Sequence, residues 1–142
     1  DRRRGQVSSG DATRGVDVRL IVPGLSTSDA KAPIYAGRNY YGELLKSGVK
    51  IYEYKKQKLH AKFAIADSLW TTIGSTNFDN RSFKYNEESN VNIYDAGFAG
   101  RMEQIFEEDQ NSCDHIDMNK FRRRPLMGRL KEAVYKFFEE EL

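Results

Sequence analysis

The stretch from Leu59 to Asn77, LHAKFAIADSLWTTIGSTN, decides how the whole chain is interpreted. Its first part, 59–66, alternates apolar residues with others, which is the pattern of a β-strand that buries one face. Because side chains two residues apart share a face of a strand, we expect His60 and Lys62 to point the same way. The pattern therefore predicts an imidazole and an ammonium group side by side.

A turn and a second strand follow this first strand. Asp67 ends the first strand, and segment 70–74 is predicted to run back beside it as the second strand of a hairpin. The return brings Ser75 and Asn77 to the edge where the imidazole and the ammonium group lie. These groups can all donate hydrogen bonds to the oxygens of an anionic, tetrahedral phosphoryl group. We expect a pocket where the loops after the two strands converge.

The spacing of the specified positions in this stretch resembles the HKD signature of the phospholipase D superfamily. Six positions carry the resemblance: His60, Lys62, Asp67, Gly74, Ser75 and Asn77. The resemblance implies an α/β fold, with a mixed sheet flanked by helices on both faces. It also implies phosphodiester chemistry through a phosphohistidine intermediate, with no cofactor. The sequence offers no dense cluster of carboxylates or of Cys and His, so we expect no metal site.

The resemblance also implies a role for each residue of the motif. His60 is the nucleophile or the general acid/base, and we favour the proton donor, while Lys62 binds the phosphoryl group. Asp67 completes the catalytic signature, although its place at the strand end favours a structural role in the turn. In the family an acidic residue orients a histidine, and Glu88 matches that position, with Glu87 beside it as the alternative. Ser75 and Asn77 are expected to bind phosphoryl oxygens with Lys62.

A paired-histidine mechanism needs one imidazole to attack phosphorus and a second to protonate the leaving oxygen. The chain has two histidines, and the second, His115, has no lysine two residues on. We therefore expect a second HKD half as a partner. It would come from the same parent chain or from a homodimer.

The residues around the motif resemble the second half of bacterial cardiolipin synthases, from about residue 16 onward. The similar segments are 40–45, 48–54, 75–83, 86–88 and 124–126. This implies a phospholipid substrate, such as phosphatidylglycerol, and a parent protein at the cytoplasmic face of the cell membrane. The chain itself is expected to be soluble. The alternative is a homodimeric, single-motif phosphodiesterase or nuclease, but a net charge of +2 makes nucleic acid an unlikely partner.

The length of 142 residues fits one domain, which we divide into a flexible segment, 1–15, and a catalytic half-domain, 16–142, with a C-terminal helix. Cys113 is the single cysteine, so no internal disulfide can form. No apolar run is long enough to cross a membrane.

Strands are expected at 16–22, 49–54 and finally 88–94, with the first two parallel. Helices are expected at 34–47, 98–110 and 126–140, and a linker at 111–119.

The last helix carries an apolar stripe, which consists of Leu126, Leu130, Val134, Phe137 and Phe138. Amphipathic stripes usually face a core, so we expect this helix to pack on the domain. The alternative is contact with anionic lipid headgroups. The basic run 122–124 favours this alternative, whereas the acidic residues Glu132 and 139–141 oppose it.

Overall fold

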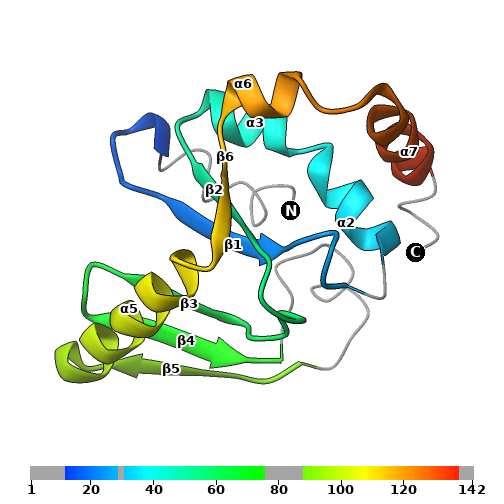
Figure 1. The fold of residues 1–142 in the computed structure, drawn as a ribbon. Coiled ribbons are helices and arrows are strands. Elements are labelled where there is room, and N and C mark those ends of the chain that lie inside the picture. The colour runs from blue at the N-terminus through cyan, green and yellow to red at the C-terminus, as the bar shows by residue number, and fades with distance from the viewer. Residues whose placement is uncertain (1–11, 29–30, 76–87, 138–142) are drawn as a thin grey trace. The chain divides into compact units, whose positions relative to one another are not determined.

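The computed structural model describes residues 12–28, 31–75 and 88–137. The described chain forms two compact units (Figure 1). One unit contains residues 60–111, and the other contains the preceding residues from 12 and the following residues from 112. Most of the segment that we expect to be flexible, 1–15, lies outside the described residues.

The unit that contains both ends of the described chain is built on a mixed sheet with the strand order β1-β2-β6. Strand β1 (Arg19–Pro23) pairs in parallel with β2 (Lys50–Tyr54), as the strand-helix-strand pattern predicts. Strand β6 (Cys113–Ile116) pairs with β2 in the antiparallel direction. The central strand β2 has Ile51 fully buried, opposite Ile116 on β6.

The helix predicted at 34–47 is two helices, α2 (Lys31–Arg38) and α3 (Tyr41–Lys46). The break occurs at Asn39, whose side-chain amide donates to the carbonyl oxygens of Tyr35 and Ala36 at 3.2 and 3.1 Å. A side chain that satisfies the last carbonyls of a helix replaces the backbone donors that would continue it. Helix α3 packs on β2, and Tyr41 belongs to the core there with Val49.

The prediction of a linker at 111–119 is wrong, because these residues form β6 and the start of helix α6 (Met118–Arg122). Asp117 is the N-cap of α6, and its carboxylate accepts a hydrogen bond from the backbone N–H of Lys120 at 2.7 Å. Strand β6 has only four residues, and its apolar end, Ile116, is buried in the core with Tyr41, Val49 and Ile51. The strand at 88–94 is therefore not the final one.

The other unit holds an antiparallel sheet with the order β3-β4-β5. Strands β3 (Phe63–Ala66) and β4 (Trp70–Gly74) form the predicted hairpin, although β3 begins four residues later than we expected. Strand β5 (Asn90–Tyr94) pairs with the far side of β4. The β3–β4 turn has Asp67 and Ser68 at positive φ angles of 53° and 51°.

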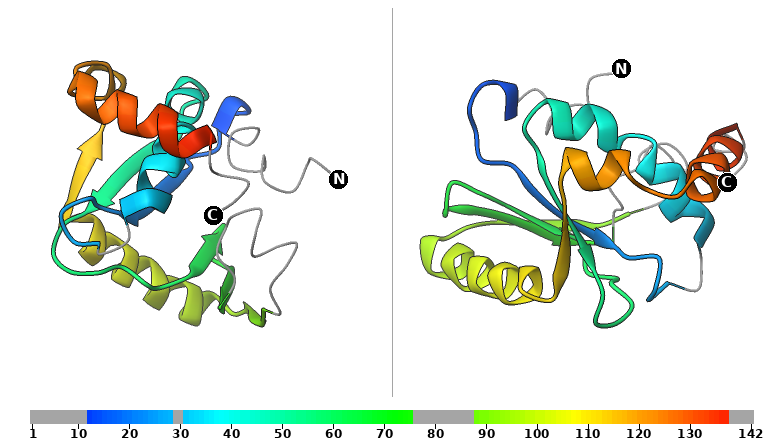
Figure 2. Two further views of the ribbon diagram at one scale, coloured as in Figure 1. Left: turned by 90° about the vertical axis from the view of Figure 1, so that its right-hand side faces the viewer. Right: turned by 45° about the horizontal axis from the view of Figure 1, so that its top comes forward.

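Helix α5 (Ala96–Gln110) lies along one face of this antiparallel sheet (Figure 2). It begins at Asp95, whose carboxylate accepts a hydrogen bond from the backbone N–H of Phe98 at 2.7 Å. Phe106 meets Phe63 of β3 edge to face, with ring centroids 6.5 Å apart. The prediction of a helix at 98–110 is thus confirmed, with two more residues at its start.

Helix α7 (Leu126–Phe137) packs beside α2, and the two helices lie side by side in Figures 1 and 2. The prediction of a packed helix is confirmed, but the predicted contact face is wrong. Leu126, Leu130 and Val134 of the apolar stripe are exposed, while Glu132 is buried. Residues 138–140 of the predicted helix lie outside the described residues.

The α/β class is confirmed, with the strands divided between two three-stranded sheets. Within the described ranges, the structure has no helix whose length and apolar content would allow it to cross a bilayer.

Candidate active site

His60, Lys62, Gly74 and Ser75 of the motif lie at the open end of the β3–β4 hairpin, opposite the turn. The backbone N–H of Gly74 donates to the carbonyl oxygen of Lys62 at 3.1 Å. This bond continues the pairing of the hairpin by one step beyond Phe63 and Ile73, the last paired residues. The sequence Gly74-Ser75 is thereby held next to Lys62, as the returning strand predicts.

His60 and Lys62 lie in contact although both precede the first residue of β3. The Lys62 ammonium nitrogen, Nζ, is 3.3 Å from Nδ1 of the His60 ring and 3.5 Å from Nε2. The same nitrogen donates to the His60 carbonyl oxygen at 2.9 Å, which fixes the lysine side chain over the backbone of its partner. The histidine is exposed, so its ring is accessible to a ligand. The predicted imidazole-ammonium pair is therefore present in the structure.

Ser75, which follows β4, and Ser89, which precedes β5, are joined by two hydrogen bonds at this end of the sheet. The Ser75 N–H donates to the Ser89 carbonyl oxygen at 3.1 Å, and the Ser75 Oγ accepts from the Ser89 N–H at 3.1 Å. Ser75 Oγ keeps its own proton, which can be donated to an anion. The contact also requires glycine at position 74, because a Cβ atom there would collide with the Ser89 carbonyl oxygen and the Asn90 side chain.

The structure separates Asp67 from the other motif residues. Asp67 occupies the hairpin turn, at the opposite end of β3 from Lys62. A strand rises about 3.3 Å per residue, so the five steps from Lys62 to Asp67 span roughly 16 Å. Aspartate is one of the residue types that tolerate a positive φ angle, which suits it to this turn.

Three of the predicted acidic and amide positions lie at the edge of the described chain or beyond it. Asn77 and Glu87 lie outside the described residues. Glu88 is half-buried and immediately precedes Ser89, the residue that pairs with Ser75. Its orienting role stays a prediction, as does the expected pocket, since the loop after β4 lies outside the described chain.

The chain's second histidine has a different setting. His115 lies exposed on β6, in the unit that does not contain His60, and its ring packs against Tyr52 with centroids 5.0 Å apart. In residues 12–28, 31–75 and 88–137, no three His, Cys, Asp or Glu side chains are grouped as a metal site would require.

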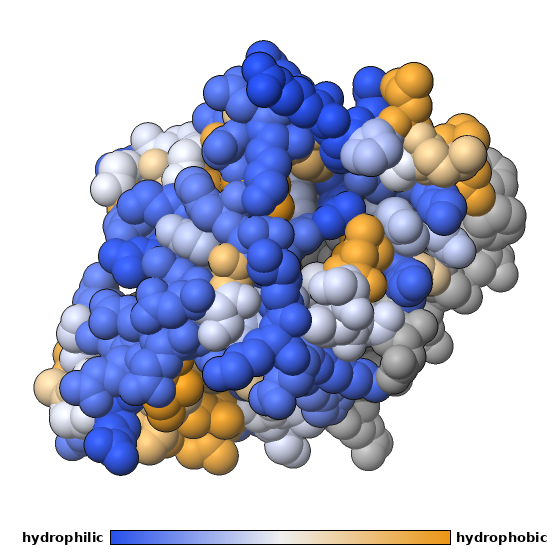
Figure 3. Space-filling view, viewed as in Figure 1, coloured by the Kyte–Doolittle hydropathy of each residue, from blue (hydrophilic) through white to orange (hydrophobic). Residues whose placement is uncertain are grey.

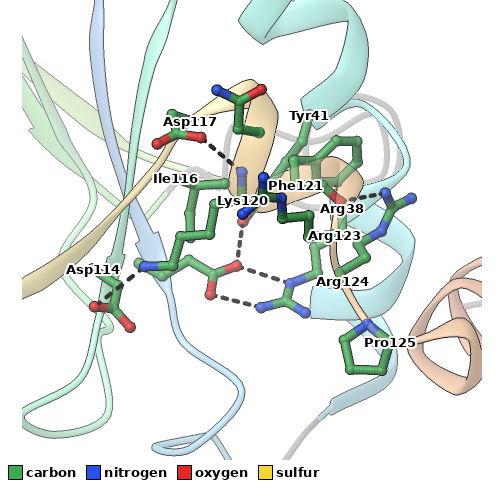
Figure 4. A pocket seen from close by; sticks show the side chains of 12 residues that line it. Arg38, Tyr41, Asp114, Ile116, Asp117, Lys120, Phe121, Arg123, Arg124 and Pro125 are labelled. Carbon is green, nitrogen blue, oxygen red and sulfur yellow. Dashed lines mark hydrogen bonds and ion pairs between the residues drawn. The ribbon is translucent and has the colours of Figure 1, made fainter.

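A cavity of about 600 Å³ lies in the unit built on β1-β2-β6, which does not contain the motif (Figure 4). Its walls come from α2, α3, β2, β6, α6 and the segment before α7. The lining residues are Arg38, Tyr41, Glu53, Asp114, Ile116, Asp117, Asn119, Lys120, Phe121, Arg123, Arg124 and Pro125.

The wall of this cavity contains a buried ion pair that sequence reasoning missed. The Arg38 guanidinium donates to both carboxylate oxygens of Glu53, at 2.8 and 2.6 Å, and the Tyr41 hydroxyl donates to the same carboxylate at 3.2 Å. Burial alone would lower the pKa of Arg38, but the hydrogen bonds and charge of Glu53 raise it. Burial, and next the charge of Glu53, raises the pKa of Tyr41. Both groups thus keep their protons, and Glu53 is already paired.

A second ion pair connects the middle of α7 to the segment before the helix. Arg124 donates through Nε to Glu132 at 2.9 Å, and its Nη2 lies 2.8 Å from the same carboxylate oxygen. These pairs have a structural rather than a catalytic character, because each charge is neutralised by a close partner. For the Arg38–Glu53 pair, the one feature of the sequence that could have indicated a buried ion pair was the charged residue Glu53 on the buried face of a strand, between apolar neighbours.

The comparisons with known proteins agree on the family. The family described as "Cardiolipin synthase, PLD-like domain" matches residues 7–110. Cardiolipin synthase 2 of Bacillus anthracis is 42% identical over 125 residues, which cover 88% of this chain and 24% of that protein. A cardiolipin synthase of Clostridium perfringens (strain SM101) is 38% identical over 123 residues, 87% of this chain and 25% of that protein.

The solved structures give the same fold. Nuc from Salmonella typhimurium, a phospholipase D family member, matches with a TM-score of 0.65 at 20% identity, over 80% of this chain and 72% of that one. The chain spans about a quarter of the length of the curated relatives it matches. With a family match over residues 7–110, the chain belongs to the family of cardiolipin synthase PLD-like domains.

Proposed function

We propose that the chain is one catalytic half of a phospholipase D-type phosphatidyltransferase that acts on phosphatidylglycerol-like phospholipids. The observation that carries the proposal is the contact between Lys62 and His60, 3.3 Å apart, next to the Gly74-Ser75 corner. A cation beside a nucleophilic or acidic imidazole is what phosphoryl transfer requires. The name of the relatives, cardiolipin synthase, supports the choice of a phospholipid.

The proposed reaction has two steps and uses no metal or cofactor. In the first, an imidazole nitrogen attacks phosphorus, the bond from phosphorus to the leaving glycerol oxygen breaks, and that oxygen takes a proton from a second imidazolium. In the second, an acceptor hydroxyl gives its proton to the second imidazole and attacks phosphorus, and the phosphorus–nitrogen bond breaks. The products are glycerol and cardiolipin when both substrates are phosphatidylglycerol.

Each residue of the motif has a place in this scheme. We assign the proton donor to His60, and the neutralisation of phosphoryl oxygens to Lys62. Ser75 adds a neutral donor, and its bond to Ser89 positions the hydroxyl. Asn77 supplies a further donor, and Glu88 or its neighbour Glu87 orients a histidine. Asp67 belongs to the signature but serves the turn.

The second imidazole is proposed to come from a second HKD half. His115 is unsuited to this task, because no lysine lies two residues after it and its ring packs against Tyr52. The curated relatives are about four times as long as the matched segment, which leaves room for a second motif in one polypeptide. Because the substrate is a bilayer lipid, we place the reaction at the cytoplasmic face of the cell membrane.

The test is the conversion of phosphatidylglycerol into cardiolipin by the full open reading frame that contains this chain. His60→Ala is expected to lower turnover by about a thousandfold or more, as loss of a general acid or nucleophile does. His115→Ala, the matched control at the chain's other histidine, is expected to keep wild-type turnover. Equal activity of the two variants would remove His60 from the mechanism.

A substrate with a p-nitrophenyl leaving group separates the two roles that His60 can have. This leaving group departs without protonation, so a variant that lacks only the proton donor still forms the covalent intermediate. We expect a burst of p-nitrophenolate from His60→Ala. The lack of a burst would reassign His60 as the nucleophile.

A homodimeric nuclease is the competing function. It predicts that the 142-residue chain alone is a dimer that cuts DNA without metal and loses this activity in His60→Ala. Light scattering and a DNA cleavage assay distinguish this outcome from the phosphatidyltransferase.

A further inference from the structure

Polar contacts determine which face of helix α7 is turned toward the protein. Glu132 is 1% exposed and binds Arg124. The backbone carbonyl of Glu132 accepts a hydrogen bond from the Asn39 side chain at 2.9 Å, and Tyr135 stacks on Tyr35 with ring centroids 5.6 Å apart. Three groups on one side of the helix, namely the Glu132 carboxylate, the Glu132 carbonyl and the Tyr135 ring, therefore fix its rotation about its own axis.

The opposite side of α7 presents an exposed apolar stripe. We define the stripe by its four members and their exposed fractions: Leu126 at 77%, Met127 at 66%, Leu130 at 61% and Val134 at 46%. Spacings of four residues (126, 130 and 134) and of three residues (127 and 130) put these side chains on one face of an α-helix. Figure 3 shows hydrophobic side chains gathered over α7.

Exposed arginines lie on α7 and in the segment just before it. Among residues 118–137 the sequence has a single carboxylate, Glu132, and its charge is neutralised by Arg124 on the protein side. Arg129 is exposed on α7 itself, and Arg122 and Arg123, of which Arg123 also lines the cavity, are exposed just before the helix. The acidic residues that the sequence carries after α7, at 139–141, lie outside the described chain.

We propose that the stripe of α7 docks on the surface of an anionic lipid bilayer. An exposed apolar face on a helix that carries and follows exposed arginines is the pattern of a helix that lies in a membrane interface, with its apolar side among the acyl chains and its cations at the headgroups. A protein partner that covered the stripe would need to pair or desolvate these guanidinium groups. The twelve residues of α7, at about 1.5 Å per residue, give a contact roughly 18 Å long.

The proposal does not rest on the phosphoryl-transfer chemistry. The stripe lies in the unit that does not contain His60, and none of its side chains belongs to the HKD motif. Docking would hold the protein at the surface whatever reaction it performs.

The first experiment measures flotation of the 142-residue chain with vesicles of phosphatidylcholine alone or with 30% phosphatidylglycerol. We expect binding to the anionic vesicles, at least about tenfold weaker binding to neutral ones, and loss of binding at high salt. Leu130→Glu is expected to weaken binding to anionic vesicles by about tenfold or more. Leu69→Glu is the matched control, because Leu69 is also exposed, at 50%, in the β3–β4 turn.

Leu130→Glu is expected to fold like the wild type, because Leu130 is 61% exposed and its replacement removes little packing. A loss of vesicle binding in this variant is therefore not caused by unfolding. Near-ultraviolet circular dichroism checks that each variant keeps its tertiary structure, and Met127→Glu is a second variant of the stripe. Equal flotation of Leu130→Glu, Met127→Glu and Leu69→Glu would overturn the proposal. So would equal binding to neutral and anionic vesicles.

The second experiment distinguishes lipid from protein as the occupant of the stripe. A fluorophore is attached at Leu130→Cys in a Cys113→Ser background, in the 142-residue chain and in the full open reading frame. Quenching by brominated phosphatidylglycerol in both proteins is the expected result. Protection from both lipid-borne and aqueous quenchers in the longer protein would mean that another part of the protein covers the stripe, and a wild-type dimer separated by Leu130→Glu would assign it to a second copy. Either result refutes lipid docking.

Discussion

At the scale of single residues, Lys62 is the group whose charge we expect to dominate ligand binding. Its ammonium nitrogen lies between the His60 ring and the His60 carbonyl oxygen, so it is held in place before a ligand arrives. A charge-assisted hydrogen bond contributes about 1.5–3 kcal/mol, so Lys62→Met should weaken tungstate binding by about 10- to 100-fold. Isothermal titration calorimetry measures this, with the exposed Lys56→Met as control. A loss of equal size in the control would indicate only a general effect of charge.

The residues of the hairpin could be predicted from sequence because alternation and turn chemistry act over a few neighbouring positions. His60 and Lys62 were expected on one side of a strand, and they are in contact. Their location before β3 could not be predicted, because strand pairing ends where the partner strand reaches Gly74. The ion pair between Arg38 and Glu53 was missed because its partners are 15 residues apart on different elements.

At the scale of elements, the close approach of β4 and β5 depends on the absence of a side chain at Gly74. Gly74→Ala should lower the free energy of unfolding by about 3 kcal/mol and displace Ser75, since the added Cβ would meet the Ser89 backbone. Urea unfolding measures this. Gly100→Ala on α5 has no atom within 4 Å of its new Cβ and should raise stability by about 0.5–1 kcal/mol. If both substitutions have the same effect, the described contact of β4 with β5 is wrong.

The attachment of α7 gives a second prediction for an element. Glu132→Gln leaves Arg124 without its counter-charge, so we expect a loss of about 2 kcal/mol of stability. Easier release of α7 in limited proteolysis should accompany it. Glu107→Gln, an exposed position on α5, is the control and should change stability by less than about 0.5 kcal/mol. An unchanged proteolysis pattern in Glu132→Gln would contradict the described packing of α7 on α2.

The start of the β1–β2 pair gives a prediction for pH dependence. Hydrogen bonds from Lys50 and then from Arg19 lower the pKa of Asp17 below its ordinary value of 3.8. The contribution of Asp17 to stability is therefore complete above that value and is lost as the pH falls through the lowered pKa. Asp17 is 44% exposed, so the contribution is less than about 1 kcal/mol. Thermal unfolding from about pH 5 to pH 2 should show a smaller decline for Asp17→Asn than for wild type, and parallel declines would contradict the pairing.

At the scale of the whole molecule, local sequence patterns predicted the α/β class but not which faces of the helices and strands are buried against other elements. The stripe of α7 was expected in a core, whereas the helix is held by Glu132, whose backbone binds Asn39 from 93 residues away. Strand β6 was expected as part of a linker, because four residues become a strand only when β2 supplies the pairing. These features depend on contacts between distant segments, for which one sequence carries no short-range signal.

The two histidines of the chain provide the most direct test of the phosphoryl site. In nuclear magnetic resonance spectra of the 142-residue chain, His60 and His115 each give one separate ring Cε1–H signal, assigned with His60→Asn and His115→Asn. We predict that tungstate, titrated at constant pH and ionic strength, shifts the His60 signal saturably and leaves the His115 signal in place. A His60 signal that does not move, or two signals that move equally, would contradict a phosphoryl-binding site formed by His60 and Lys62.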